Sequence, residues 1–190
     1  MLEIKKLAIP IIENINGKII KKIGDAIFAE FSDANTCIEA AISIQKQLLN
    51  RNKITKKEDN IYIRIGLHSG IVIRKDKDLF GHDVNLCSRI ESVAINGSIA
   101  ASKNILLEYI GKNILKREMG YIKFKNIPNP RQVYKIYLDN NEYQSETTPK
   151  LQNILDNTGV NRVDINNYKV QDVFSLSVLT IPPVSLSLLF

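Results

Sequence analysis

Two small groups of polar residues have the types and the spacing to do chemistry. Lys21 stands four positions before Asp25 in a predicted β-hairpin, so a cation and an anion are fixed on a rigid element. Asn85 and Arg89 are also four apart, in a predicted helix, and therefore project from one face. Each group alone has a plain structural explanation, as a turn aspartate or as a polar helix surface. Their occurrence in one chain favours a functional site.

The charge of the chain suits a polyanionic partner. Lys and Arg number 26 against 20 Asp and Glu, which gives a net charge of +6. Such a charge fits a nucleotide triphosphate, a nucleic acid or an acidic membrane. The basic residues are scattered, however, and the strand segments lack the interleaved aromatic residues expected of a single-strand-binding surface. We therefore expect no nucleic-acid partner.

The elements that must position these residues follow from hydrophobic periodicity and turn signals. Helices are predicted at 3–15, 32–50, 83–94 and 103–110, and strands at 18–23, 26–31, 61–67, 71–73, 98–101, 121–124 and 132–138. Gly24-Asp25 predicts one tight hairpin, and Ser69-Gly70 predicts a second hairpin between 61–67 and 71–73. Helix-strand-strand-helix-strand-strand indicates an α+β fold rather than a doubly wound sheet.

Cysteines and the chain ends carry little chemistry of their own. Cys37 and Cys87 fall in apolar helical patterns without metal-ligand spacing, so they are predicted to be free core residues. The first ten residues lack the apolar core of a signal peptide, and we expect a cytoplasmic main body without a membrane segment. Residues 173–190 are apolar but short and interrupted by Pro182-Pro183, which leaves a membrane anchor or a linker to a second domain as alternatives.

Six motifs in order resemble the catalytic domain of class III adenylate/guanylate cyclases, over residues 5 to 138. They are the helix ending in Asn16-Gly17, Lys21-x-x-Gly24-Asp25, the 64–70 segment Arg-Ile-Gly-Leu-His-Ser-Gly, Phe80-Gly81-x-x-Val84-Asn85-x-x-Ser88-Arg89, Gly97-Ser98-Ile99, and Lys125-Asn126-Ile127-Pro128 followed by Val133-Tyr134. Each motif is weak alone, but six in register are specific. The resemblance implies a ferredoxin-like nucleotidyl cyclase fold, an antiparallel sheet with helices packed on it.

The resemblance also implies roles for the polar residues. Asp25 matches a metal-binding aspartate, and the complete domain is expected to hold two Mg²⁺ (or Mn²⁺) ions. Arg89 matches the transition-state arginine and Asn85 the residue that orients the ribose. Lys21 and Asp78 match the purine-selecting pair, whose donor and acceptor fit adenine, so ATP is the expected substrate and cyclic AMP the product. The family works as a dimer with composite sites, so a homodimer or pairing with another cyclase subunit is expected.

The chain departs from the family pattern at its beginning. The pattern opens with a strand that carries the first metal aspartate, and the only acid here before residue 13 is Glu3. We expect residues 1–140 to form a catalytic domain that lacks its first strand, with a linker and an unassigned segment from 141 to 190. A cyclase inactive as this fragment is one interpretation, and a catalytically dead module that binds nucleotide or dimerises is the other.

Overall fold

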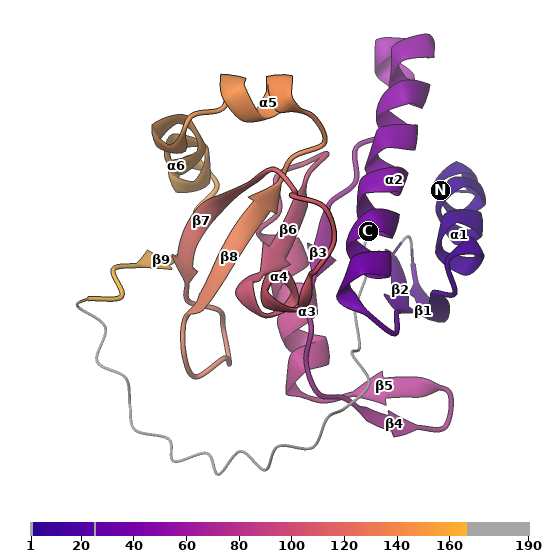
Figure 1. Cartoon of the computed structure of the whole chain (residues 1–190), viewed down its shortest axis with the longest axis horizontal. Helices are drawn as coiled ribbons and strands as arrows, with labels where there is room; N and C mark the ends of the chain where they lie inside the picture. Colours follow the sequence, from indigo (N-terminus) through magenta and orange to yellow (C-terminus); the bar gives the residue numbers. More distant parts are fainter. Residues whose placement is uncertain (1, 25, 167–190) are drawn as a thin grey trace.

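The computed structural model describes residues 2–24 and 26–166. Its helices are α1 (Leu2–Asn14), α2 (Ala34–Ile54), α3 (His82–Ser92), α4 (Lys103–Glu108), α5 (Asn140–Ser145) and α6 (Thr148–Asn157), with a short 3₁₀ helix, η1, at Lys57–Asp59. Its strands are β1 (Lys18–Ile23), β2 (Ala26–Glu30), β3 (Ile65–Leu67), β4 (Ile73–Lys75), β5 (Asp78–Phe80), β6 (Ile99–Ser102), β7 (Lys116–Ile122), β8 (Arg131–Ile136) and β9 (Arg162–Val163). The α+β fold predicted from the sequence is confirmed (Figure 1).

A mixed sheet with strand order β3-β6-β8-β7-β9 forms the centre of the domain. Successive residues of β6 point to opposite faces, so the sheet has two separate cores. Ile99 and Ala101 pack with α1, α2 and α4, whereas Ala100 packs with α3 and α6. Figure 1 shows the β4–β5 hairpin projecting away from this sheet as an arm.

The first hairpin and the helices around it form where the sequence predicts them. Antiparallel β1 and β2 pair from Lys18–Glu30 to Ile23–Ala26. Gly24 takes a φ of 62°, which glycine adopts without a steric penalty. Asp33 caps α2 by accepting a hydrogen bond from the Thr36 amide at 2.9 Å. No strand among the described residues pairs with the outer edge of β2 or of β3.

The second predicted hairpin, between 61–67 and 71–73, is wrong. Only Ile65–Leu67 forms a strand there, and it pairs in parallel with β6. All three residues are buried, as in a strand covered on both faces, and a Cβ on Gly66 would lie 2.4 Å from the Glu91 amide of α3. The hairpin forms instead between β4 and β5, where Asp76 adopts a φ of 56° in the two-residue turn. Without glycine, this turn gave no sequence signal.

Residues 141–163, expected to belong to a linker and an unassigned segment, pack on the domain. Leu151 and Leu155 of α6 are fully buried in the core that also holds Leu86 and Ile90 of α3. Strand β9 pairs with β7, and the side chain of Lys135 lies 3.0 Å from both Glu142 and Glu146. Polar residues surround the apolar positions of α6, so the sequence pattern did not predict this helix. The predicted unassigned segment beyond residue 166 lies outside the described residues.

Both cysteines are free and buried, as predicted. Burial raises the pKa of the Cys37 thiol well above its usual value, with a smaller contribution from Cys87 nearby. The Cys37 thiol is therefore not a reactive group. No helix in the described part of the chain combines the length and apolar character that a membrane crossing requires.

Candidate nucleotide-binding site

Lys21 and Asp78 are brought together although 57 positions separate them in the chain. Lys21 on β1 donates a hydrogen bond of 2.8 Å from Nζ to Asp78 Oδ2 on β5. The amide of Leu79 donates to the other carboxylate oxygen at 2.7 Å. The hydrogen bond from Lys21 lowers the pKa of Asp78 against the opposing effect of burial. The two side chains are about one-third exposed, so both can still contact a ligand.

Two aromatic rings flank the lysine of this pair. The ammonium of Lys21 lies 5.7 Å from the ring centroid of Phe28 and 5.8 Å from that of Phe80. A cation at these distances is attracted to the face of a ring. Phe80 follows Asp78 on the same strand at an interval of two, so both side chains project from one face of β5. The rings and the carboxylate together hold the ammonium in place.

Asn85 and Arg89 line a cavity of about 280 Å³ along the exposed face of α3. The other residues that line this cavity are His82, Ser88, Lys125, Asn126 and Ile127. The apolar face of α3, with Leu86 and Ile90, is buried against the sheet. The sequence prediction that Asn85 and Arg89 share one helix face is confirmed. Neither Lys21 nor Asp78 lines this cavity.

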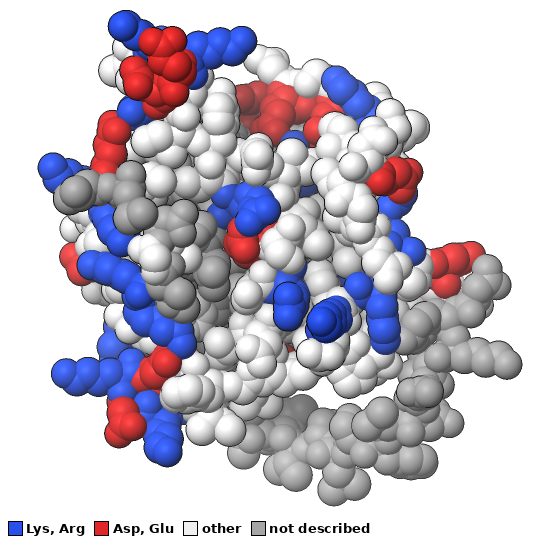
Figure 2. Space-filling view, turned by 180° about the vertical axis from the view of Figure 1, so that it is seen from behind, with Lys and Arg blue, Asp and Glu red and all other residues white. Residues whose placement is uncertain are grey.

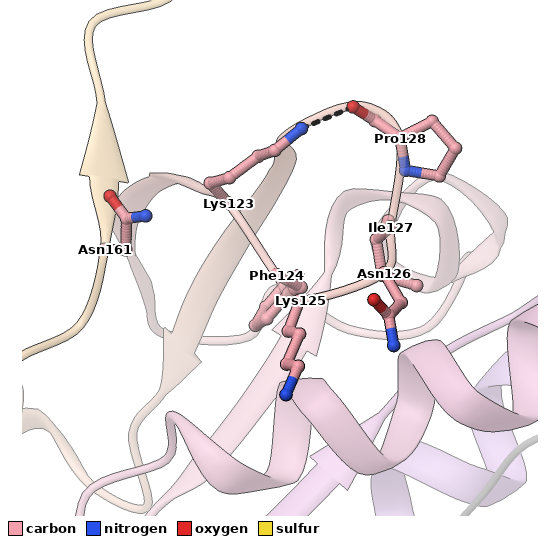
Figure 3. A pocket seen from close by; sticks show the side chains of 7 residues that line it. All are labelled: Lys123, Phe124, Lys125, Asn126, Ile127, Pro128 and Asn161. Carbon is pink, nitrogen blue, oxygen red and sulfur yellow. Dashed lines mark hydrogen bonds between the residues drawn. The ribbon is translucent and has the colours of Figure 1, made fainter.

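The loop between β7 and β8 forms the opposite wall of the cavity. Phe124 and Ile127 are buried and anchor the loop in the core, while Lys125 and Asn126 between them are exposed. Figure 3 shows Lys125 and Asn126 pointing away from Lys123, which donates a hydrogen bond to the Pro128 carbonyl at 2.5 Å. Lys125, Asn126 and Ile127 also line a second cavity of about 660 Å³, which reaches Lys123 and Asn161 and is the one drawn in Figure 3. The sequence gave Lys125 only as part of a motif, without a role.

Arg89 and Lys125 are cations without acidic partners among residues 2–24 and 26–166. Neither forms a salt bridge, in contrast to six other basic residues: Lys21, Arg51, Arg64, Arg74, Lys135 and Arg162. Two unpaired cations on facing walls create a positive potential between them. Asn85 adds a neutral donor and acceptor in the same cavity. This combination suits an anion that also carries hydroxyl groups.

The candidate metal ligand, Asp25, lies outside the described residues. Within the described ranges, no group of three or more His, Cys, Asp and Glu side chains could hold a metal ion. Glu3, the acid nearest the beginning of the chain, forms an ion pair with Arg51 at 2.8 Å. The described residues therefore do not themselves fit a two-ion site. Asp25 is the contribution that this sequence offers to one.

The charged side chains on one face of the molecule lie in separate groups. Figure 2 shows Lys and Arg side chains in separate groups over one face, divided by uncharged surface and by acidic residues. Binding along a phosphate backbone calls for a continuous basic stripe. The cavity at α3 instead has the size of a small ligand.

The chain belongs to the family of adenylate and guanylate cyclase catalytic domains, whose sequence profile matches residues 10–138. The putative adenylate cyclase 3 of Rhizobium meliloti is 31% identical over 132 residues, which are 68% of this chain and 22% of that protein. An adenylate cyclase of Anabaena cylindrica is 36% identical over 98 residues, 43% of this chain and 20% of that protein. The chain thus spans about a fifth of the length of these relatives.

Solved structures agree on the fold. An adenylate/guanylate cyclase/hydrolase from Silicibacter pomeroyi superposes with a TM-score of 0.65 at 29% identity, covering 73% of this chain and 83% of that one. The adenylyl cyclase CyaB from P. aeruginosa gives a TM-score of 0.57 at 22% identity, covering 73% and 80%. The second likeness concerns the fold alone. The family and the nucleotidyl cyclase fold expected from the six motifs are confirmed.

Proposed function

We propose that this chain supplies the nucleotide-binding residues of an adenylate cyclase, which converts ATP to 3′,5′-cyclic AMP and pyrophosphate in second-messenger signalling. The observation that carries the proposal is the cavity between α3 and the β7–β8 loop, which Arg89 and Lys125 line together with Asn85. In this proposal they bind the triphosphate, and Asn85 orients the ribose. Lys21 and Asp78 recognise the base.

Adenine fits the Lys21–Asp78 pair better than guanine does. Asp78 can accept a hydrogen bond from the exocyclic amine of adenine, and Lys21 can donate to a ring nitrogen. Guanine presents a carbonyl and a ring N–H at these positions, so both contacts are mismatched. Each mismatch costs about 1–3 kcal/mol when the groups are desolvated. The pair is held together before a ligand binds, which reduces the entropy lost on binding.

The reaction requires the 3′-hydroxyl of the ribose to attack the α-phosphorus in line with the departing pyrophosphate. Asn85 restricts the ribose so that this hydroxyl faces the phosphorus. The planar guanidinium of Arg89 binds two phosphate oxygens as negative charge builds on them. Lys125 neutralises charge on the pyrophosphate as it leaves. These residues bind, orient and stabilise, and none of them is placed to take the hydroxyl proton.

Mg²⁺ or Mn²⁺ is the cofactor that the family implies. Asp25 is the carboxylate that this chain offers, and Glu3 is already paired with Arg51. Two ions require a second carboxylate besides Asp25. The described residues, which do not include Asp25, contain no cluster of side chains that could hold a metal ion. We therefore expect the 190-residue polypeptide alone to bind ATP without producing cyclic AMP.

A second copy of the chain, or another cyclase subunit, is the proposed partner. Three large apolar side chains are exposed on the arm and just before it: Ile71 at 61%, Ile73 at 66% and Phe80 at 47%. Exposed apolar residues gathered on one projecting element favour a protein contact. Because Phe80 also flanks Lys21, such a contact would adjoin the purine pair.

A binding experiment tests the proposal directly. Titrating the purified chain with a fluorescent ATP analogue should show saturable binding that excess ATP displaces better than GTP. Arg89→Ala and Lys125→Ala should each weaken binding of ATP by about 10- to 100-fold, and leave binding of adenosine unchanged. Lys112→Ala removes an exposed lysine elsewhere and is the matched control. Absence of ATP binding by the unaltered chain would refute the proposal.

The alternative is a module that binds nucleotide but never turns it over. The engagement of Glu3 by Arg51 at 2.8 Å, which occupies a carboxylate near the start of the chain, favours this alternative. Mixing the chain with a cyclase subunit that carries both metal aspartates but has its transition-state arginine removed separates the two. Cyclic AMP formation in the mixture, and its loss with Arg89→Ala, supports the enzyme. ATP binding with no cyclic AMP in any mixture supports the module.

A further inference from the structure

The carboxylate of Asp83 joins the first turn of α3 to the loop that follows β3. Its Oδ2 accepts a hydrogen bond of 2.7 Å from the amide of Ile71. Its Oδ1 lies 3.4 Å from Nε2 of His68 and 3.3 Å from Nδ1 of His82. The side chain is about three-quarters buried. One carboxylate therefore contacts two residues of the loop, His68 and Ile71, and its neighbour His82 on α3.

His68 extends this connection into the core. Its side chain is 3% exposed, and its Nδ1 lies 2.8 Å from the hydroxyl of Ser102, the N-cap of α4. If this hydroxyl donates to Nδ1, the ring proton resides on Nε2 and points toward Asp83. The separation of 3.4 Å is long for a hydrogen bond, and Nε2 has no hydrogen-bond partner among the described residues. Asp83 is thus the partner that the buried imidazole has on this side.

Gly70 allows the loop to approach the carboxylate so closely. A Cβ at this position would lie 2.4 Å from both Cγ and Oδ2 of Asp83. Such a contact is too short for any side chain, so alanine would push the carboxylate away from the Ile71 amide. Gly70 has no positive φ, and the effect of a substitution would therefore come from space rather than from backbone strain.

The start of α3 has no other side-chain anchor. Its N-cap residue is Gly81, which supplies no capping side chain. Helices normally begin with a side chain that binds the free amides of the first turn. Here the acidic residue of the first turn binds the neighbouring loop instead. Asn85 follows two residues after Asp83 and Arg89 lies about one turn further along, so their positions depend on how this end of the helix is held.

We infer that Asp83 is a positioning residue: it fixes the first turn of α3 against the 68–71 loop and so sets where Asn85 and Arg89 stand relative to Lys125. The inference rests on the proposed function for the importance of that placement. Asp83 itself does not line the cavity. Its effect on ligand binding is exerted through α3.

Amide exchange followed by mass spectrometry tests the placement without any nucleotide. Asp83→Ala should accelerate exchange in the peptide covering 82–86 by at least about 10-fold, while peptides from α2 and β8 stay unchanged. Asp59→Asn, an exposed acid beyond α2, should change nothing. Unchanged exchange at 82–86, or an increase spread evenly over the domain, would overturn the inference.

Ligand binding gives the second readout. Asp83→Ala should weaken binding of the fluorescent ATP analogue by about 10-fold, because small misplacements of binding groups are costly. Faster exchange with unchanged affinity would show a structural role alone and would also overturn the inference. If the unaltered chain binds no nucleotide, the proposed function fails, while the exchange measurement still decides whether Asp83 holds α3.

Gly70→Ala provides a variant that keeps every polar group. It should reproduce both effects of Asp83→Ala by displacing the carboxylate. In the double variant the carboxylate is already gone, and the added methyl group meets the Cβ of residue 83 at 2.7 Å, so the two changes should be non-additive because both remove the same carboxylate contact. Additive losses would indicate that the two residues act separately and would contradict the inference. This variant also serves if Asp83→Ala does not fold.

Discussion

Lys21 Nζ lies 2.8 Å from Asp78 Oδ2, and this pair joins the first hairpin of the domain to the projecting arm. Strand β1 belongs to a two-stranded sheet with β2, and β5 belongs to another with β4. The ion pair is thus both a contact between two sheets and the candidate purine-reading group. Its preassembly in the chain makes specificity testable by single substitutions.

Asp78→Asn should lower the preference for ATP over GTP. The amide can donate to the guanine carbonyl as well as accept from the adenine amine, so the mismatch penalty of about 1–3 kcal/mol is largely relieved. The ratio of the two dissociation constants should fall by about 10-fold or more. Competition titrations measure this ratio. Arg74→Lys, which alters a salt bridge on the same arm, should leave it unchanged, and an unaltered ratio in Asp78→Asn would mean that Asp78 does not read the base.

Arg89→Lys separates charge from geometry. Lysine retains the positive charge but cannot bind two phosphate oxygens in a planar, bidentate manner. ATP affinity should therefore fall less than in Arg89→Ala, whereas cyclic AMP formation in a complemented mixture should fall about as far, by 10²-fold or more. Binding titrations and a product assay on the same samples check this split. Equal activity of the lysine variant and the unaltered chain would exclude a bidentate role.

Asp83 should stabilise the domain only above acid pH. Burial opposes its ionisation, but the nearby imidazole of His68, the hydrogen bond from the Ile71 amide and the ring of His82 outweigh burial and lower its pKa from 3.8 to about 2. A carboxyl with a lowered folded-state pKa contributes its stability above pH 3.8 and loses it as pH falls toward 2. The difference amounts to about 2 kcal/mol. Urea unfolding across this pH range should show a shallower decline for Asp83→Asn than for the unaltered chain or Asp59→Asn.

Leu155→Ala should destabilise the whole domain. Leu155 on α6 is fully buried in the core beneath α3, so truncation leaves a cavity and costs about 2–5 kcal/mol. Ile154→Ala, on the same helix but only partly buried, should cost much less. Chemical denaturation compares the two variants. If Leu155→Ala were harmless, α6 would behave as the linker that the sequence suggested.

The sequence predicted the elements whose patterns are local and regular. The stripe of α2 and the Gly24 turn identify themselves by spacing and backbone preference. The interval of four between Asn85 and Arg89 likewise predicts that both lie on one helix face. The resemblance of six motifs supplied the family and paired Lys21 with Asp78, which spacing alone could not do because 57 positions lie between them.

The predictions that proved wrong concern segments whose structure depends on contacts between residues far apart in the sequence. Ile65–Leu67 pairs with a strand more than thirty residues away rather than with its neighbour, because both of its faces are buried. The turn at Asp76 contains no glycine, so the sequence pattern did not predict it. Lys125 gains a role only because the β7–β8 loop lies opposite α3, and Asp83 because the 68–71 loop folds back on it. Such relationships depend on tertiary structure.

Strand β9 ties the last described part of the chain to a wall of the candidate site. The carbonyl of Asn161 accepts a hydrogen bond of 2.9 Å from the Lys123 amide, two residues before Lys125. Because β9 also pairs with β7, force applied to the polypeptide beyond β9 would reach the β7–β8 loop through this ladder as well as through the Asn161–Lys123 bond. A tag, surface tether or fusion partner attached on that side would therefore be expected to change ligand affinity. A fluorophore placed there could report on whether the cavity at α3 is occupied.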